Sequence, residues 1–318
     1  MRTPAAYPEP SHTDSNDRRL VQIVRKSDIS QPGAVNILGI PFDGAVLGRK
    51  GAAEGPGAIR RAMGGFSNYN IELGVGLEDA NVYDLGDLVV GDADVVKVHS
   101  LVEEEVKREL RGDSILAILG GDNSISLPAL RASASKFGKL GLVVVDSHLD
   151  LRGKLDGRPT SGSSYGLAVE EGLVDPKNVV EIGAHGFMNS KVYVDKARKL
   201  GIKLFSAEEL SRRGPGAVAR EACALAIRGT DAVYLSFDLD AIDLAQVPGV
   251  SAPSAGGMWA RNAFALMYEV ARMEQVKCAD LVELAPSLDP SGKSERVAAG
   301  ALTYLIAGFV VRRAGRKD

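Results

Sequence analysis

The chain has few cysteines, no excess of charge of one sign and no long apolar run. Among its 318 residues are only two cysteines, Cys223 and Cys278, and their apolar surroundings favour buried free thiols over a disulfide framework. Lysine and arginine number 38 against 41 aspartates and glutamates, so the net charge of −3 gives no sign of a nucleic-acid partner. The apolar runs fall short of the ~20 residues that cross a membrane. The remaining expectation is a globular protein with neither nucleic acid nor membrane as partner, and 45% hydrophobic and 25% charged residues agree with it.

Residues 1–30 differ in composition from the rest of the chain. They are polar and hold three prolines, so we expect a mobile or peripheral arm. They also lack the apolar segment of a secretory signal, which makes the cytoplasm the expected location. Beyond them, neither an internal repeat nor a Ser/Gly-rich linker divides the sequence, so we expect residues 31–318 to form one domain.

Short apolar runs alternate with helical patterns from residue 34 onward. The runs expected to be strands are rich in Val, Ile and Leu and span 34–40, 82–85, 114–119, 140–146, 178–183, 201–205, 232–238 and 277–284. The helical patterns span 56–63, 93–110, 124–136, 190–200, 214–228, 259–274 and 294–310. Such alternation predicts a parallel sheet with helices on both faces. Ligands of these sheets bind beyond the carboxyl ends of the strands, so the residues that follow each strand carry the functional information.

Side chains able to bind metal or cation follow four of the expected strands. Asp146, His148 and Asp150 alternate along the chain after Val145 and therefore share one side while the chain stays extended. Asp238 and Asp240 form a second alternating pair at the end of the run 232–238. The full set is Asn123, Asp146, His148, Asp150, Asp238, Asp240 and Glu283.

A single aspartate after a strand is most simply a helix cap, but these aspartates are too many for that explanation. Two negative charges ~4 Å apart repel by ~4 kcal/mol at an effective dielectric constant near 20. Four converging aspartates therefore favour two bound divalent cations. Oxygen ligands with one imidazole suit Mn²⁺ first, with Zn²⁺, Co²⁺ and Ni²⁺ as alternatives, and a pair of such ions lowers the pKa of a shared water.

Several segments resemble the motifs of the ureohydrolase family, which includes arginases, agmatinases and formimidoylglutamases. The segments, in order over residues 35–310, are KGAAEGPGAIR, GGDNSIS, VVVDSHLDLR, YLSFDLDAID, PGVSAPSAGGM and LVELAP. The resemblance implies a single three-layer α/β/α domain, arginase-like, with a mainly parallel sheet of about eight strands. It also implies a catalytic domain with a binuclear Mn²⁺ centre, which hydrolyses a C–N bond of a small linear amidine or guanidine. Homo-oligomers, trimers or hexamers, are implied as well.

Carried over position by position, the resemblance assigns roles to the set above. Asp146 and Asp238 match the aspartates that bridge two metal ions. One ion would be surrounded by Asn123, Asp146, Asp150 and Asp238, and the other by Asp146, His148, Asp238 and Asp240. Glu283 matches the acid that pairs with the cationic carbon group of the substrate, a contact that would orient this group for attack. Asp150 or water is the expected proton carrier.

Two positions depart from the pattern of arginases and agmatinases. Asn123 stands where those members carry a histidine, and an amide oxygen is a weaker ligand than an imidazole. Tyr165, in SGSSYGLA, stands where they carry a second histidine, and a phenol with pKa near 10 shuttles protons poorly. With the segment EIGAHGFMNS at 181–190, these departures resemble the formimidoylglutamase branch. The implied reaction converts N-formimidoyl-L-glutamate to L-glutamate and formamide, with Tyr165 near the substrate.

Three more residues are candidate substrate contacts. His185 follows the strand 178–183, and Arg158 and Arg296 could bind glutamate carboxylates, because a guanidinium pairs with them bidentately. Asn189 and Ser190 are expected to cap the next helix.

Two alternatives remain open from the sequence. A ureohydrolase acting on a guanidino acid or an agmatine-like substrate would release urea. The loss of two family histidines also fits a metal-poor, noncatalytic or activating subunit. The retained aspartates and His148 argue against that second alternative, because their mutual repulsion would then have no relief.

Overall fold

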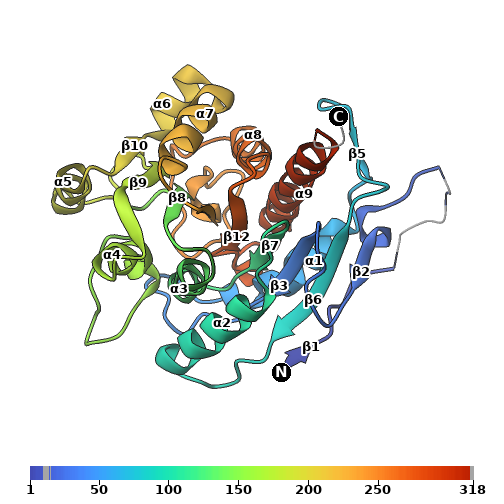
Figure 1. Cartoon of the computed structure of the whole chain (residues 1–318), viewed down its shortest axis with the longest axis horizontal. Coiled ribbons are helices and arrows are strands. Elements are labelled where there is room, and N and C mark those ends of the chain that lie inside the picture. Colours follow the sequence, from blue (N-terminus) through green and yellow to red (C-terminus); the bar gives the residue numbers. More distant parts are fainter. Residues whose placement is uncertain (10–13, 15, 316–318) are drawn as a thin grey trace.

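The computed structural model describes residues 1–9, 14 and 16–315, which form a central sheet between two layers of helices (Figure 1). The sheet runs in the order β1-β6-β3-β7-β12-β11-β8-β9-β10, and β2 also pairs with β6. All neighbouring strands are parallel except β1 and β6. The strands are β1 Arg2–Thr3, β2 Val24–Lys26, β3 Val35–Gly39, β6 Val82–Leu88, β7 Ile115–Leu119, β8 Leu140–Val145, β9 Val174–Ile182, β10 Lys203–Phe205, β11 Ala232–Asp238 and β12 Val276–Val282.

Helices cover both faces of this sheet, as the alternating pattern predicts. Those on one face are α1 Gly55–Met63, α7 Pro215–Ala226, α8 Ala260–Ala271 and α9 Lys293–Ala314, with the short α6 Ala207–Arg213 at its margin. Those on the other face are α2 Val95–Glu109, α3 Ser126–Phe137, α4 Ser164–Glu170 and α5 Lys191–Leu200. A small hairpin, β4 Tyr69–Asn70 with β5 Val75–Gly76, lies outside the main sheet. The three-layer α/β/α arrangement is confirmed.

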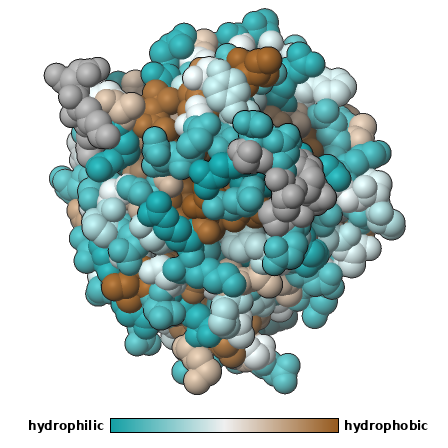
Figure 2. All heavy atoms as spheres, turned by 90° about the vertical axis from the view of Figure 1, so that its right-hand side faces the viewer, coloured by the Kyte–Doolittle hydropathy of each residue, from teal (hydrophilic) through white to brown (hydrophobic). Residues whose placement is uncertain are grey.

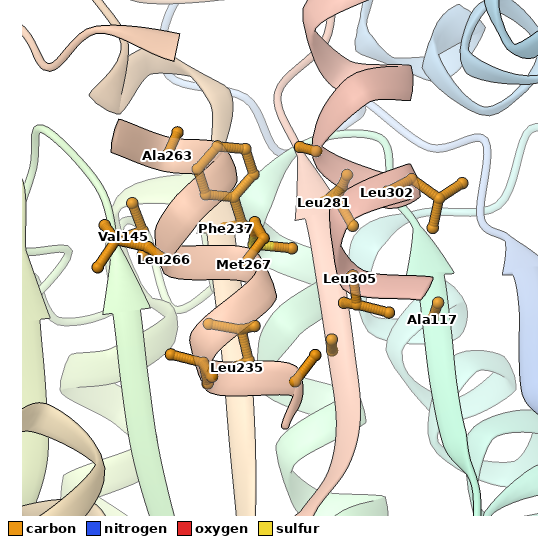
Figure 3. Packing of buried hydrophobic residues seen from close by; sticks show 14 of the residues in the cluster. Ala117, Val145, Leu235, Phe237, Ala263, Leu266, Met267, Leu281, Leu302 and Leu305 are labelled. Atoms are coloured by element: carbon orange, nitrogen blue, oxygen red, sulfur yellow. The ribbon is translucent and has the colours of Figure 1, made fainter. Parts of the chain in front are cut away.

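The larger core lies between the sheet and helices α8 and α9. Side chains of the central strands, such as Phe237 and Leu281, meet Met267 of α8 and Leu305 of α9 (Figure 3). All four side chains are at most 1% exposed. The near-continuous apolar runs of the strands therefore reflect burial on both faces.

Helix α9 is long and apolar enough for a membrane span by length and composition alone, but 61% of its most apolar window is buried inside the fold. It packs against α8 and α1 as a core helix. The face of the molecule that lies to the right in Figure 1 is mostly hydrophilic, with scattered apolar patches (Figure 2). The apolar character of α9 is thus accounted for by packing within the protein.

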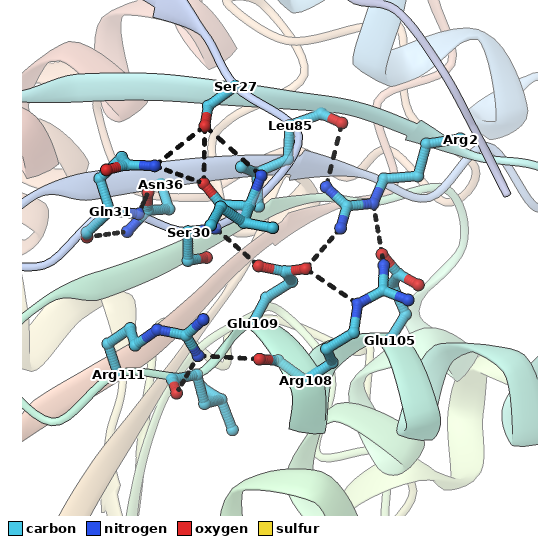
Figure 4. Close-up of polar contacts among 12 residues, drawn as sticks. Arg2, Ser27, Ser30, Gln31, Asn36, Leu85, Glu105, Arg108, Glu109 and Arg111 are labelled. Atoms are coloured by element: carbon cyan, nitrogen blue, oxygen red, sulfur yellow. Dashed lines mark hydrogen bonds and ion pairs between the residues drawn. The ribbon is translucent and has the colours of Figure 1, made fainter.

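The N-terminal segment is packed against the edge of the sheet. Strands β1 and β2 both pair with β6, and neither was predicted. Arg2 forms ion pairs with Glu105 and Glu109 of α2 and donates a hydrogen bond to the Leu85 carbonyl at 3.2 Å (Figure 4). The arm is therefore peripheral, and its described ends are held in place. Residues 10–13 and 15 of this arm, including His12, lie outside the described part of the chain.

Both cysteines are free thiols, as predicted: Cys278 is buried and Cys223 is half-buried.

Candidate active site

The polar residues singled out in the sequence lie at or just beyond the carboxyl ends of four strands that are neighbours in the sheet. These strands lie in the order β7-β12-β11-β8. Asn123 follows β7, Glu283 follows β12, Asp238 ends β11 and Asp146 follows β8. Because these strands are parallel, their carboxyl ends meet at one edge of the sheet, and the four side chains gather there.

Asp146, His148 and Asp240 form the centre of this cluster. Their potential ligand atoms all lie within 4.8 Å of one another. His148 Nδ1 is 3.0 Å from Asp240 Oδ2 and 3.5 Å from Asp146 Oδ1. Burial alone would lower the pKa of His148, but the two carboxylates raise it to about 12. Two carboxylates that attract a proton this strongly would also attract a metal cation.

The same cluster holds a carboxylate oxygen that lacks a partner. Asp146 Oδ2 is fully buried and has no hydrogen-bond donor among the described residues. Burial, and then the charges of Asp240 and Asp150, raise the pKa of Asp146 well above its usual range. Burial, and then the charges of Asp240, Asp146 and Glu283, also raise the pKa of Asp238 well above its usual range. Cations are the natural relief for such a group, so these residues fit divalent metal ions.

Backbone groups hold the two metal-type loops in shape. Asp238 accepts a hydrogen bond from the Asp240 backbone nitrogen at 2.8 Å, and Asp146 accepts one from the His148 backbone nitrogen at 2.6 Å. Ser147 donates both its hydroxyl and its backbone N–H to Asp240. The expectation of an extended chain after each strand is therefore wrong: both segments turn, and the first carboxylate of each accepts a hydrogen bond from the backbone nitrogen two residues on.

Glu283 is held in a strained but well-anchored conformation. Its backbone φ of +69° is rare for a residue other than glycine, and Asp150 at the same site also has a positive φ, +44°. One Glu283 oxygen accepts from the Asn123 backbone nitrogen at 2.7 Å, and the other accepts from the Ser251 hydroxyl. Burial, together with the charge of Asp122, raises the pKa of Glu283 to about 8. A cationic ligand beside Glu283 would reverse that shift.

Asn123 lies below the cluster and connects it to the interior. Its amide nitrogen donates to Asp150 Oδ2 at 2.6 Å, and its amide oxygen contacts the hydroxyls of Ser126 and Tyr165. Burial is the main reason that the pKa of Asp150 is raised to about 6. Tyr165 is fully buried, so its place is beneath Asn123, away from the cavity surface. The metal-binding role of Asn123 stays a prediction, because its nitrogen faces Asp150 here.

A cavity of about 120 Å³ opens above these acids. Its acidic part consists of Asp150, Asp238, Asp240 and Glu283, with His148 beside them. The rest of the lining is mixed: the polar side chains are Arg152, Ser161, Asn189, Ser190, Tyr193 and Ser251, and the apolar ones include Leu47, Leu149, Leu151 and Met188. A small cavity with an acidic base suits a compact, cationic ligand.

Three predicted substrate contacts lie elsewhere. Arg158 lines a separate surface pocket beside Asp156 and Pro159. Arg296 lies on the exposed side of α9, close to Gly65. Both were chosen by residue type alone, and the folding of the chain takes them to other surfaces.

His185 is also outside the cavity. Its ring nitrogens contact the Gly183 carbonyl at 2.8 Å and the Ser254 hydroxyl at 2.7 Å, and the residue lines a different pocket with Trp259. Its position after a strand was correctly read, but β9 lies to the side of the four strands that carry the acids. The structure thus favours a local, hydrogen-bonded histidine.

Two cavity residues were missed or misread from the sequence. Arg152 lies two residues beyond Asp150, and its guanidinium stacks over the Tyr193 ring at 5.3 Å from the ring centre. Its place in the segment VVVDSHLDLR was the available signal. Asn189 was expected to cap α5, but its side chain accepts from the Leu149 backbone nitrogen and donates to the Ser147 carbonyl. It braces the loop that carries His148, a contact between distant segments that local sequence does not reveal.

Comparisons with known proteins agree with this geometry. A model of the arginase family matches residues 33–308. The formimidoylglutamase of Halobacterium salinarum is 34% identical over 305 residues, which cover 94% of this chain and 96% of that protein. The crystal structure of formimidoylglutamase from Bacillus subtilis has a TM-score of 0.88 at 28% identity and 94% coverage of both chains. That of Trypanosoma cruzi formiminoglutamase with Mn²⁺ has a TM-score of 0.83 at 30% identity, over 92% of this chain and 98% of that one. This chain therefore belongs to the arginase family.

Proposed function

We propose that the chain is a Mn²⁺-dependent formimidoylglutamase, which hydrolyses N-formimidoyl-L-glutamate to L-glutamate and formamide. The observation that carries the proposal is the cavity itself, with Glu283 and the aspartates at its base and Arg152 on its wall. The likeness to formimidoylglutamases in sequence and structure supports this choice of substrate.

The donor set supports a pair of divalent cations. Asp146, His148 and Asp240 would hold one ion, with Asp238 beside them, and Asp150 would help to hold the second. The T. cruzi relative in the comparison contains Mn²⁺, which supports manganese here. When bound, two such ions supply a water of lowered pKa as the nucleophile.

Glu283 is the group that positions the reacting end of the substrate. A formamidinium cation carries one positive charge on a planar N–C–N unit, which a carboxylate pairs with through charge-assisted hydrogen bonds. The Asn123 backbone nitrogen and the Ser251 hydroxyl fix both Glu283 oxygens before the substrate arrives. A carboxylate fixed in this way lowers the entropic cost of placing the formimidoyl carbon over the metal cluster.

Arg152 is the group placed to bind the glutamate end. The substrate has two carboxylates, and a guanidinium recognises a carboxylate through two parallel hydrogen bonds. Stacking on Tyr193 holds the Arg152 guanidinium at the cavity wall. This assignment replaces Arg158 and Arg296, which lie on other surfaces.

Asp150 is the proposed proton carrier. It lines the cavity at the edge of the acidic cluster, where its carboxylate is hydrogen-bonded to Asn123. As water adds to the formimidoyl carbon, Asp150 would take up a proton and pass it to the glutamate nitrogen. The bond between the carbon and that nitrogen then breaks, and formamide and glutamate leave.

The test is the identity of the product. Mn²⁺-loaded protein and a chelator-treated control are incubated with N-formimidoyl-L-glutamate, and separately with guanidino acids and agmatine, and formamide and urea are measured. Metal-dependent formamide from the first substrate is the expected result. Urea from a guanidino substrate would move the assignment to another member of the family. No product from any substrate would favour a noncatalytic subunit.

The assembly and the location are further proposals. The resemblance to ureohydrolases supports a homo-oligomer of three or six chains, which light scattering of the purified protein would test. The two free thiols agree with the cytoplasm as the location, and fractionation of the source cells would test it.

A further inference from the structure

A buried carboxylate, Asp280, lies at the centre of a hydroxyl cluster beneath Asn123. Asp280 belongs to β12 and is fully buried. Its Oδ2 is 2.7 Å from the Ser126 hydroxyl and 2.6 Å from the Tyr234 hydroxyl, and its Oδ1 is 2.6 Å from the Ser236 hydroxyl. The Phe237 backbone nitrogen also donates to Oδ1 at 3.3 Å. Burial raises the pKa of Asp280 above its usual value, whereas the donors around both oxygens act against that shift and favour the ionised, acceptor-only form of the carboxylate.

The cluster continues from Asp280 to Asn123 through two hydroxyls. The Ser126 hydroxyl lies 2.8 Å from Asn123 Oδ1. The Tyr165 hydroxyl lies 3.2 Å from the same oxygen and 2.8 Å from the Ser236 hydroxyl. Asp280 itself does not touch Asn123, so any influence of the carboxylate on the amide passes through these hydroxyls.

The number of available protons decides which way the Asn123 amide faces. Ser126 has one hydroxyl proton but sits between two acceptors, Asp280 Oδ2 and Asn123 Oδ1. If that proton goes to the carboxylate, the contact between the Ser126 and Asn123 oxygens has no proton and is repulsive. Tyr165 likewise has one hydroxyl proton and two acceptors, Asn123 Oδ1 and the Ser236 oxygen, because Ser236 gives its own proton to Asp280. One of the two Tyr165 contacts is therefore also left without a proton. With its oxygen turned to the cluster, Asn123 leaves two of these contacts without a proton.

Rotating the amide by half a turn satisfies every contact. The amide nitrogen then donates one proton to Ser126 and one to Tyr165, Tyr165 donates to Ser236, and both serines donate to Asp280. The amide oxygen now faces Asp150, where two oxygens meet at a separation that needs a cation between or beside them. Orientations of amide groups follow from such networks. The cluster and a bound metal ion therefore favour the same orientation of Asn123.

We propose that Asp280 is a positioning residue for the metal centre, which acts through Ser126 and Tyr165 to turn the Asn123 carbonyl toward the ion beside Asp150. The inference rests on the proposed metal centre. In metal-free protein the Asn123 nitrogen pairs with Asp150, and metal binding exchanges that hydrogen bond for the satisfied cluster below. The substitution of asparagine for a stronger imidazole ligand is thus compensated by a carboxylate that lies outside the reach of the metal.

Asp280→Asn is the decisive variant because it replaces one acceptor oxygen by an NH₂ donor and keeps the shape of the side chain. The Phe237 N–H requires an acceptor, so the new amide oxygen takes the place of Oδ1 and the new nitrogen faces Ser126 and Tyr234. This nitrogen donates to Ser126, whose own proton then goes to Asn123. The Asn123 oxygen is now held toward the cluster, away from the metal.

The experiment is a calorimetric titration of metal-free protein with Mn²⁺. Wild type should bind about two Mn²⁺ ions. In Asp280→Asn the affinity for one of them should fall by ~10-fold or more, as is typical when a residue that orients a metal ligand is lost. Tyr234→Phe removes another hydroxyl from the same Asp280 oxygen but does not touch the chain to Asn123. It serves as the matched control, with an expected change below ~3-fold.

The Asn123→Ala background separates orientation from simple loss of charge. If Asp280 acts through Asn123, Asp280→Asn should change Mn²⁺ affinity little in this background, whereas a direct effect of charge would persist. The inference would be overturned if Asp280→Asn lowered Mn²⁺ affinity equally in both backgrounds, or if it did not lower the affinity when Asn123 is present.

Two further outcomes are also decisive. If Asp280→Asn fails to fold, Ser126→Ala compared with Tyr234→Phe decides, and equal effects of the two would refute the positioning role. Wild type that binds no Mn²⁺ would overturn the proposed function, and the inference with it.

Discussion

Within the acidic cluster, the buried Oδ2 atom of Asp146 is the oxygen that lacks a hydrogen-bond partner among the described residues. Burial raises the pKa of Asp146, and the neighbouring carboxylates raise it further. Asp238 completes the same cluster from the next strand, β11. These two residues are the positions that the family resemblance assigns to both ions.

Asp238→Ala should therefore abolish turnover and leave the fold intact. We expect kcat to fall by about 1000-fold or more, because residues that act as a unit lose nearly all activity together. The loss of one charge from a repulsive cluster should not lower the melting temperature of metal-free protein. Turnover near the wild-type level would show that the metal cluster is not the reaction centre.

Arg152 and Arg158 form a matched pair for testing substrate recognition. Arg152→Ala should raise KM for N-formimidoyl-L-glutamate by ~10- to 100-fold, since a hydrogen-bonded charge pair contributes ~1.5–3 kcal/mol. Arg158→Ala should leave KM unchanged because that side chain lines another pocket. A small formamidine without carboxylates should be hydrolysed equally by both variants. The reverse ranking in KM would return the carboxylate site to Arg158.

Residue identity could be predicted where chemistry is local and could not where it depends on distant contacts. The alternation of the aspartates and His148 directly after strands could be read from the sequence, and the structure brings Asp146, His148 and Asp240 together. Their metal-binding role stays a prediction. Arg158 was misplaced, and the bracing role of Asn189 was missed, because both depend on how a loop folds over the sheet edge.

At the level of elements, the start of α9 is fastened by Asp289. One oxygen of this carboxylate accepts from the backbone nitrogen and hydroxyl of Ser294, and the other accepts from Ser291. Although burial acts in the other direction, these hydrogen bonds lower the pKa of Asp289 to about 2. The carboxylate does the work of a helix cap, because Gly292 at the cap position has no side chain to do so.

Asp289→Ala should destabilise the metal-free protein by ~1 kcal/mol at neutral pH. The pKa in the folded state lies below the ~3.9 of an unfolded aspartate, so the stabilisation is complete above pH ~4 and is lost as pH falls toward 2. Urea unfolding of wild type and variant at pH 7, 4 and 3 would measure it. A difference between the two proteins that grows on acidification would contradict this assignment.

A buried ion pair fixes α1 against β6. Arg60 is 1% exposed and contacts both oxygens of Asp84, at 2.8 and 2.9 Å. Arg60→Leu should destabilise the fold by ~3–5 kcal/mol, because the buried Asp84 carboxylate would lose the positive charge that is paired with it. Lys191→Met breaks an exposed pair with Asp195 and should cost less than ~1 kcal/mol. Equal losses in chemical denaturation would show that the Arg60 pair is not structurally important.

The elements that escaped prediction have weak local signals. Helix α4 contains two poor helix formers, Ser164 and Gly166, and is held by burial of Tyr165 and Leu167. Strands β1 and β2 are two and three residues long and form only because β6 offers a free edge. Their stability comes from tertiary contacts, which a local pattern does not contain.

At the scale of the whole molecule, the alternation of strands and helices predicts the three layers, and the structure confirms them. The order of the strands is a different matter. Residues far apart in sequence, such as Asn123 and Glu283, meet because β7 and β12 are neighbours, with β11 and β8 next in line. Only the family resemblance anticipated that meeting, since no local rule sets which parallel strands lie side by side.

One cluster of acids is proposed to bind the metal ions and to carry the reaction, so a single titration tests both roles. Metal-free protein is supplied with increasing equivalents of Mn²⁺, and the initial rate of formamide release from N-formimidoyl-L-glutamate is followed at each step. We expect no activity without metal and a plateau of the rate near two ions per chain, the number that the paired aspartates can hold. Full activity in the chelated protein, or a plateau that bears no relation to bound metal, would contradict this expectation.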